Sequence, residues 1–295
     1  MDGKLAPMNE QQKTEKIPGR KISRRRFLTT TLGLGGGLVA GKGFVWEPRN
    51  LQVVELALIL PKIPPGRELR LVQLSDLHIN RYNGYFRRVA EAAMKLRPDI
   101  ILLTGDYLEE QRNLSEVRSF LKLLEAPEGI FAVQGNWEYW SRLEGENLRQ
   151  KFQASGVQLL INQQQQLDIR DVPLTIHGLD YPSGSENLVI LEHQADPGRV
   201  NLLLSHVPEF SHHLLGSKFD LIMSGHTHGG QVRLPLLPPF YLPRYSGNFV
   251  AGLYRVGPHQ TPLYVTRGIG TSVLPIRLWC RPEITLLRLQ SSLAT

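Results

Sequence analysis

The length, composition and charge of this chain exclude several classes of protein. Its 295 residues are 41% hydrophobic, so the chain can bury a full core and is not disordered. Of the formal net charge of +7, residues 1–26 carry +5, because eight Lys or Arg there face three acids. The nearly neutral remainder offers no broad surface for a polyanion, and nucleic-acid binding is not expected. The lone cysteine, Cys280, excludes an intramolecular disulfide and a thiolate cage, so any metal must use N and O ligands.

Residues 1–45 are predicted to lie outside the folded domain, as a disordered basic tail followed by a signal or anchor segment. The sequence Ser23-Arg24-Arg25-Arg26-Phe27-Leu28 precedes a glycine-rich, weakly apolar run over 29–40 that is too short for an ordinary membrane span. This resembles a twin-arginine signal and implies the twin-arginine export machinery as a partner, with a periplasmic or other extracytoplasmic location. No small-x-small cleavage site is present, which leaves open a retained membrane anchor. The alternative is a basic tail beside a Gly-rich linker.

The predicted domain, residues 50–292, alternates strand-like and helix-like patterns. Its first half is predicted to contain strands over 53–60, 68–74, 99–104, 129–134 and 157–161, with helices over 83–96 and 114–124. Its second half is predicted to contain strands over 174–178, 200–204, 220–223, 231–234, 249–256, 263–266 and 284–289. A core of two sheets with helices outside accommodates this order.

Five of the predicted strands end in side chains that can bind metal. An isolated His or Asp at a strand end is more often a hydrogen-bonded structural residue. The carboxyl ends of strands are, however, where open α/β sheets gather their ligands. The five segments, in chain order, are Asp76-x-His78, Gly105-Asp106, Gly135-Asn136, His206 and Gly225-His226-Thr227-His228.

In this order and spacing, the five segments resemble the calcineurin-like metallophosphoesterases, whose pattern is D-x-H, G-D, G-N-H-D/E, H and G-H-x-H. The segments over 225–231, 267–272 and 281–283 are most similar to the exported YkuE/YaeI-like branch of that family. The resemblance covers about residues 50–290. It implies an α/β fold, specifically a four-layer αββα sandwich of two mixed β-sheets flanked by helices. It also implies hydrolysis of a phosphoester or pyrophosphate bond by a metal-bridged hydroxide.

The same resemblance implies two divalent metal ions. The residues that would hold one ion are Asp76, His78 and His228, those that would hold the other are Asn136, His206 and His226, and the bridging residue would be Asp106. Among them, Asp106, Asn136 and His206 are the predicted catalytic residues. Such a pair lowers the pKa of a bridging water and neutralises charge on the phosphoryl oxygens. The mixed ligand shell accepts Mn, Fe, Zn, Co or Mg, so the sequence leaves the metal open.

The chain departs from the family pattern at Trp137, where the family has a histidine. An indole can donate a hydrogen bond but cannot supply a proton to a leaving group. Either the leaving group is stable as an anion, as in a pyrophosphate link, or another residue acts as the acid. His177 and Asp180 are candidates for that role, with a strand-end turn as the alternative.

The sequence also contains candidates for substrate binding. Arg244 and Arg267 could hold a phosphate or diphosphate, with surface ion pairing as the alternative. Aromatic residues among prolines over 235–254 could line an apolar pocket, which suggests a phosphorylated small molecule or a lipid-linked substrate. One alternative activity is cleavage of UDP-2,3-diacylglucosamine in lipid A synthesis, although export argues against it. A second alternative is a catalytically weak metal-binding module of the envelope.

Overall fold

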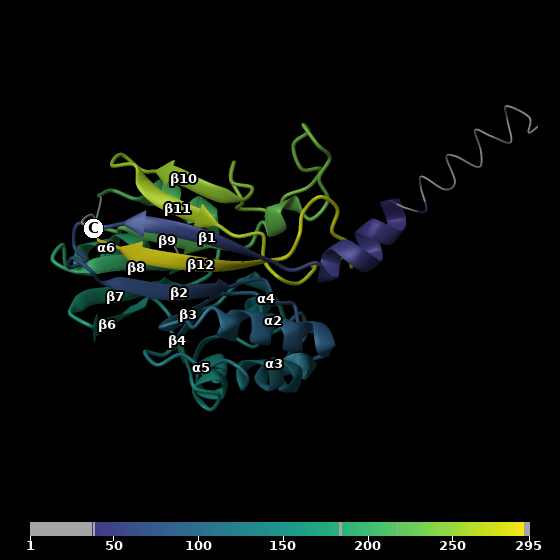
Figure 1. Cartoon of the computed structure of the whole chain (residues 1–295), viewed down its shortest axis with the longest axis horizontal. Helices are drawn as coiled ribbons and strands as arrows, with labels where there is room; N and C mark the ends of the chain where they lie inside the picture. Colours follow the sequence, from purple (N-terminus) through teal and green to yellow (C-terminus); the bar gives the residue numbers. More distant parts are fainter. Residues whose placement is uncertain (1–36, 38, 183–184, 217, 292–295) are drawn as a thin grey trace, which may run out of the picture. The chain divides into compact units, whose positions relative to one another are not determined.

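The computed structural model describes residues 37, 39–182, 185–216 and 218–291 (Figure 1). The chain divides into two compact units, residues 1–40 and 41–295, and the second contains the helices and strands named here. The predicted tail and the twin-arginine motif lie outside the described residues and stay predictions. The second unit begins with a π-helix, η1 (Lys42–Trp46), and a short 3₁₀-helix, η2 (Glu47–Arg49). None of the helices described has the length and apolar content needed to cross a membrane.

Two mixed sheets of six strands each form the centre of this unit. The first sheet has the order β1 (Gln52–Ile59), β12 (Glu283–Gln290), β2 (Glu68–Leu74), β3 (Ile100–Thr104), β4 (Ile130–Val133) and β5 (Val157–Leu159). The second has the order β10 (Gly252–Val256), β11 (Thr261–Val265), β9 (Leu221–Ser224), β8 (Val200–Ser205), β7 (Val172–Leu179) and β6 (Gln163–Ile169). In the first sheet β2, β3, β4 and β5 are parallel, and β12 pairs antiparallel with β2. In the second sheet the inner strands are parallel, and the antiparallel pairs are β10 with β11 and β6 with β7 at the two ends.

Helices cover the outer faces of the sheets, and three hydrophobic clusters separate the layers. The first sheet packs against α2 (Gly84–Lys95), α3 (Leu114–Leu121) and α5 (Gly145–Gln153), as Figure 1 shows beside β2, β3 and β4. The second sheet packs against α6 (Ser185–Gln194) and η4 (Pro208–His213). Between the sheets, alternate residues such as Leu71, Leu102 and Leu202 form the central cluster. The predicted four-layer αββα sandwich is confirmed.

The predicted strand over 231–234 is wrong. Val232 makes only an isolated bridge to Leu278, and the chain after it contains prolines that cannot donate to a ladder. Strand β6 was not predicted, because its run of four glutamines shows no apolar alternation. It forms by pairing antiparallel with β7 over its whole length. Helices α5 and α6 were also not predicted.

Strands β2, β3 and β4 are parallel in the first sheet, and β7, β8 and β9 are parallel in the second. The loops that follow their carboxyl ends meet at the same end of the sandwich. A hydrogen bond from Gln73 Nε2 to the Ser224 carbonyl and one from His206 Nδ1 to the Thr104 carbonyl join the two sheets there. The fold therefore brings the five predicted ligand segments to one place.

Candidate metal centre

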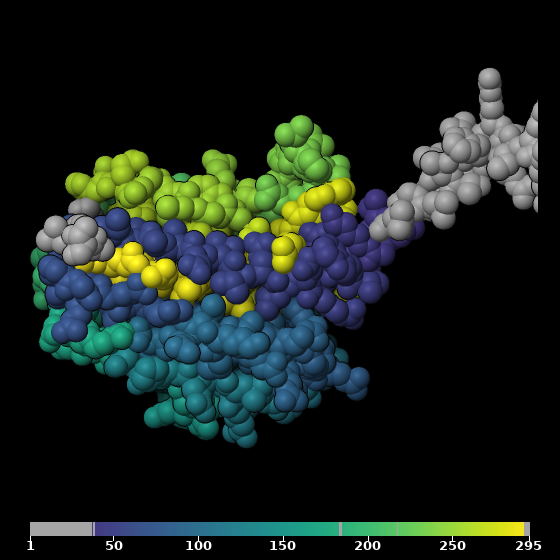
Figure 2. Space-filling view, viewed as in Figure 1, coloured from purple at the N-terminus to yellow at the C-terminus, as the bar shows by residue number. Residues whose placement is uncertain are grey.

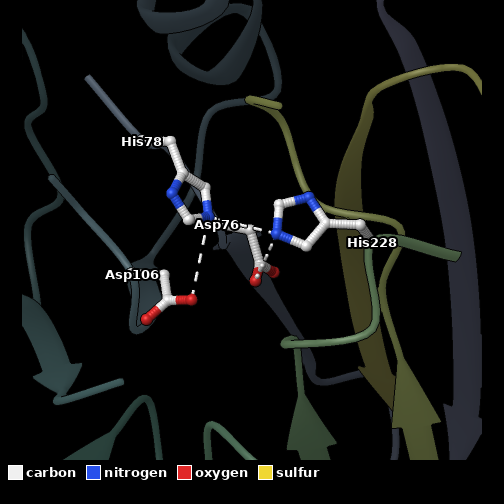
Figure 3. A group of neighbouring side chains, drawn as sticks. All are labelled: Asp76, His78, Asp106 and His228. Carbon is white, nitrogen blue, oxygen red and sulfur yellow. Dashed lines mark hydrogen bonds and ion pairs between the residues drawn. The ribbon is translucent and has the colours of Figure 1, made fainter. Parts of the chain in front are cut away.

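Two groups of buried ligand atoms lie at this end of the sandwich, and they share one carboxylate. Asp76, His78, Asp106 and His228 offer atoms that lie within 4.8 Å of one another, and so do Asp106, His206 and His226. Figure 3 shows the first group, whose side chains come from the loops after β2, β3 and β9 and point toward one another. Asp106 belongs to both groups, which is the arrangement needed to bridge two ions.

Inside the cluster, imidazole nitrogens and carboxylate oxygens lie close together in contacts that only partly satisfy them as hydrogen bonds. In the first group, the Nε2 atoms of His78 and His228 lie 3.1 Å apart. The Asp76 Oδ1 atom lies 3.5 Å from His228 Nε2, while its buried Oδ2 has no hydrogen-bond partner among the described residues. Because neutral imidazole and carboxylate are the usual ligands of divalent transition metals, this converging set fits such an ion.

The second group has a similar geometry around His206. Its Nε2 atom lies 3.2 Å from Asp106 Oδ2, 3.2 Å from Asn136 Oδ1 and 3.2 Å from His226 Nδ1. The structure thus brings together all seven predicted ligands. That they bind metal and act in catalysis remains our proposal.

Hydrogen bonds on the far side of the ring orient two of the histidines, and a carboxylate faces the far side of a third. His206 Nδ1 lies 2.7 Å from the Thr104 carbonyl, and His226 Nε2 lies 2.6 Å from the Arg244 carbonyl. Each carbonyl accepts a hydrogen bond from the ring nitrogen that faces it, so the other ring nitrogen is the one that faces the cluster. The Nδ1 atom of His78 lies 3.5 Å from Glu109 Oε1. Partners of this kind set the tautomer of a metal-binding histidine and raise its basicity.

The backbone of the ligand loops is held in a conformation that ordinary residues avoid. Positive φ values occur at five of the seven predicted ligands, which are Asp76, His78, Asp106, His226 and His228. For a non-glycine residue this left-handed conformation costs about 1 kcal/mol or more. Strain of this kind persists where the surrounding structure enforces it and is concentrated at functional sites.

Close packing explains why glycine precedes some of the ligands. A Cβ atom on Gly225 would overlap Ser75 Oγ and Asp76 Oδ2, and one on Gly135 would overlap Asp106 Oδ1. A larger residue at either position would push the neighbouring carboxylate out of place.

Glu138 fixes the loop that carries the shared carboxylate, a role that our sequence analysis missed. Its buried carboxylate accepts hydrogen bonds from the backbone N–H groups of Gly135, Asp106 and Tyr107, at 2.7, 3.0 and 2.8 Å. The backbone N–H of Trp137 donates to Asp106 Oδ1 at 2.9 Å. The acidic position in the G-N-H-D/E pattern was the available signal for Glu138. Glu109 lies outside the family's ligand pattern, so nothing in the sequence marked it as a residue of the site.

The pKa values of the cluster show strong coupling of its charges. Burial raises the pKa of Asp106, but the neighbouring His206 outweighs burial and holds it at about 2. Burial lowers the pKa of His206, but Asp106 outweighs burial and raises it to about 9. Burial, with His206 nearby, lowers the pKa of His226 to about 4. Burial, with His78 nearby, holds the pKa of His228 well below its usual range. His226 and His228 are therefore neutral at pH 7, as metal ligands must be.

A cavity of about 490 Å³ opens beside the cluster. Part of its wall is formed by four of the predicted ligands, Asp106, Asn136, His226 and His228. Most of the remaining wall is apolar or aromatic and includes Trp137, Trp140, Phe240, Tyr241, Val273, Leu274 and Ile276. Part of the predicted aromatic segment over 235–254 therefore does line an apolar cavity.

The candidates for proton donation do not reach the cluster. His177 is fully buried, with Nε2 3.0 Å from Asn201 Oδ1 and its ring against Phe219, beneath α6. Asp180 accepts hydrogen bonds from Tyr139 and Gln134, at 2.5 and 2.6 Å.

The two candidate arginines also have other contacts. Arg267 pairs with Glu283 at 2.6 Å, and Arg244 touches His226 through its carbonyl while its side chain is exposed. Neither arginine is among the residues that line the cavity. A phosphate-binding role for them remains untested.

The two-sheet sandwich and the buried ligand cluster around the shared Asp106 carboxylate are the features expected of a metal-dependent phosphohydrolase. Residues 69–230 match the calcineurin-like phosphoesterase family. The chain is 30% identical to the uncharacterized metallophosphoesterase YkuE of Bacillus subtilis, over 92% of this chain and 99% of that one. It is also 30% identical to the phosphodiesterase YaeI of Escherichia coli, over 91% and 99% of the two chains. The chain therefore belongs to the calcineurin-like phosphoesterases, hydrolases that use two divalent metals.

Another relative is the UDP-2,3-diacylglucosamine pyrophosphatase LpxG of Chlamydia trachomatis. It is 28% identical over 83% of this chain and 92% of its own length. The relatives thus include both a phosphodiesterase and a pyrophosphatase.

Proposed function

We propose that this enzyme hydrolyses a phosphodiester or pyrophosphate bond in a substrate with an apolar part. The observation that carries this proposal is the apolar cavity that opens directly onto Asp106, Asn136, His226 and His228. When bound, two divalent ions supply an activated water and neutralise charge on the phosphoryl oxygens. The seven ligands would hold the two ions at one side of the cavity, and the apolar part of the cavity wall binds the apolar end of the substrate.

The position of Trp137 favours a leaving group that needs no proton. Its ring lines the cavity, stands edge-on to the His78 ring at 5.7 Å and contacts the Trp140 ring at 5.2 Å. The side chain that occupies the family's histidine position therefore faces the substrate without an acidic proton. General acid assistance contributes about 10²–10⁴ in rate, so its absence penalises alkoxide leaving groups most. Phosphate and aryloxide groups leave readily as anions.

We further propose that the enzyme acts on the outer side of the cytoplasmic membrane, exported by the twin-arginine route. The support is the sequence Ser23-Arg24-Arg25-Arg26-Phe27-Leu28 with the uncharged run that follows it. Cleavage of UDP-2,3-diacylglucosamine is the second candidate function. Similarity to LpxG and a cavity suited to acyl chains favour it, while a cytoplasmic UDP-sugar substrate argues against it.

A panel of substrates tests the proposed function. Purified enzyme reconstituted with Mn²⁺, Zn²⁺ or Mg²⁺ is assayed on bis-p-nitrophenyl phosphate, a pyrophosphate-linked diester, UDP-2,3-diacylglucosamine and an alkyl phosphate monoester. We expect turnover of the first two at rates at least about 100-fold above the last. Equal rates on all substrates would refute the argument from Trp137. Metal uptake without turnover on any substrate would favour the metal-binding envelope module.

A further inference from the structure

Exposed apolar side chains surround the mouth of the cavity. Five of the residues that line it are also largely exposed to solvent, namely Trp140, Phe240, Tyr241, Val273 and Leu274. Leu236 and Leu237 extend the exposed apolar surface along the loop before Phe240, and Leu236 is fully exposed. Apolar residues that cluster at one functional opening are unusual on a soluble monomer and mark a surface that contacts something else.

The beginning of the folded unit adds to the same surface. Three apolar residues of η1 are exposed, namely Phe44, Val45 and Trp46, whereas the preceding residue, Gly43, is buried. The Gly43 carbonyl accepts a hydrogen bond from Arg277 N, next to the cavity residue Ile276. Figure 2 shows the loop around 235–245, the segment around 270–280 and η1 together at one end of the unit. We call these exposed apolar residues of η1, the 236–241 loop and 273–274 the mouth face.

Several arginines flank the segments of the mouth face in the sequence. Between Asp220 and Glu283 the sequence contains six arginines and no acidic residue. Arg49 follows the exposed part of η1, Arg233 precedes Leu236, and Arg244 follows Tyr241. Within the described part of the chain, none of these three arginines has an ion-pair partner. A face that combines exposed aromatic and aliphatic side chains with unpaired basic groups is complementary to an anionic lipid surface.

The chain that precedes the mouth face in sequence favours the same partner. Residues 27–40 contain no charged residue, and they join the folded unit at Gly41, three residues before Phe44. This run is too short to span a bilayer as an ordinary helix, but without charges it can lie against one, and in the sequence it leads into η1 of the mouth face.

We infer that the mouth face docks on an anionic lipid bilayer, so that the apolar part of a membrane-embedded substrate enters the cavity from the bilayer. The docking rests on the exposed apolar residues, the arginines that flank them and the uncharged run before them, and only the choice of substrate rests on the proposed function. Membrane binding of such a face scales with the apolar area buried and with attraction to anionic lipid.

Vesicle sedimentation with the full-length chain tests this inference. The face variant carries Phe44→Ser, Leu236→Ser and Leu237→Ser, whose side chains are 50%, 104% and 52% exposed and do not line the cavity. The matched control carries Ile59→Ser, Ile190→Ser and Leu215→Ser, which are 63%, 52% and 66% exposed. Strand β1 is parallel to β12, and β12 is antiparallel to β2. The carboxyl end of β1, where Ile59 lies, is therefore at the opposite end of the sheet from the ligand loop after β2.

On vesicles of phosphatidylcholine with phosphatidylglycerol, we expect the face variant to bind at least about tenfold more weakly than wild type and control. Wild type should also bind vesicles of phosphatidylcholine alone more weakly than vesicles that contain phosphatidylglycerol, because the basic groups are attracted to the anionic lipid. Equal binding by the face variant and wild type would overturn the inference. A second result would also overturn the inference. If wild type forms a concentration-dependent dimer without vesicles, and the face substitutions dissociate it, then a second copy of the chain covers the mouth face.

Turnover of soluble bis-p-nitrophenyl phosphate without vesicles separates this inference from the proposed function. We expect it to be the same in wild type, face variant and control. If wild type fails to turn it over, the proposed function fails while the binding result still decides the docking.

Discussion

Glu109 Oε1 lies 3.5 Å from Nδ1 of His78, on the side of the imidazole ring that faces away from His228 and Asp106. Burial opposes the charge of Glu109, but His78 and Asn80 hold its pKa below the usual value. The carboxylate is therefore ionised at pH 7 and is placed to orient the His78 ring.

Replacement of this carboxylate should weaken metal binding. We expect Glu109→Gln to reduce metal affinity about 10–100-fold, because Gln carries no charge to hold the His78 tautomer. Competition with a metal chelator, followed by elemental analysis, measures the affinity. Glu110→Gln is the control, since Glu110 is exposed and, among the described residues, forms an ion pair only with Arg112. Equal metal affinities in the two variants would contradict the role of Glu109.

Loss of the shared carboxylate should affect both ions. We expect Asp106→Asn to lose at least one bound metal and to reduce kcat by at least about 100-fold, because an amide bridges two cations poorly. The measurements are metal content per chain and turnover of bis-p-nitrophenyl phosphate. Circular dichroism checks that the fold is intact. A folded variant with two metals and wild-type turnover would show that Asp106 does not bridge.

Removal of the Glu138 carboxylate should destabilise the loop that carries Asp106. In Glu138→Gln an amide N–H₂ group would face backbone N–H donors that now bond to the carboxylate. Unmet buried donors cost about 1–3 kcal/mol, so we expect the free energy of unfolding to fall by about that amount. Urea denaturation of the metal-free protein measures it. Glu91→Gln, an exposed partner of Arg87, should change stability by less than about 0.5 kcal/mol.

The metal-free protein should lose stability at alkaline pH. His206 has a pKa of about 9 in the folded state, above its ordinary value, because Asp106 stabilises the protonated ring. The stabilisation is therefore complete below about pH 6.5 and is lost as the pH rises toward 9, by about 3 kcal/mol in all. Thermal unfolding after EDTA treatment, at pH 6 and pH 9.5, measures the loss. If the His206→Asn variant loses the same stability between pH 6 and pH 9.5, the loss belongs to another titrating group.

A histidine at position 137 should widen the range of leaving groups. We expect Trp137→His to raise turnover of an alkyl phosphate monoester at least about tenfold relative to turnover of bis-p-nitrophenyl phosphate, because imidazolium can protonate an alkoxide. Trp140→His is the control, since Trp140 lines the cavity but does not contact the His78 ring. An unchanged ratio of the two rates would mean that the tryptophan does not set the preference.

Much of the fold could be predicted from local patterns. Strands β2, β3, β4, β8 and β9 are short, apolar and followed by Gly, Asp, Asn or His, and all five are present within two residues of the predicted bounds. The segments that could not be predicted depend on their neighbours. The glutamines of β6 form a strand because β7 offers a paired edge, and the chain over 231–234 stays out of the sheets because prolines follow it.

The sequence by itself determined which residue types end each strand, and therefore the class of chemistry. Only the tertiary structure decided how those ends meet, because Asp76 and His228 are brought together by strands from two different sheets. It also placed Glu109 behind His78 and gathered η1 and the 236–241 loop beside one cavity. Local periodicity reports only which face of a strand is buried, whereas such contacts between distant segments depend on the packing of the two sheets.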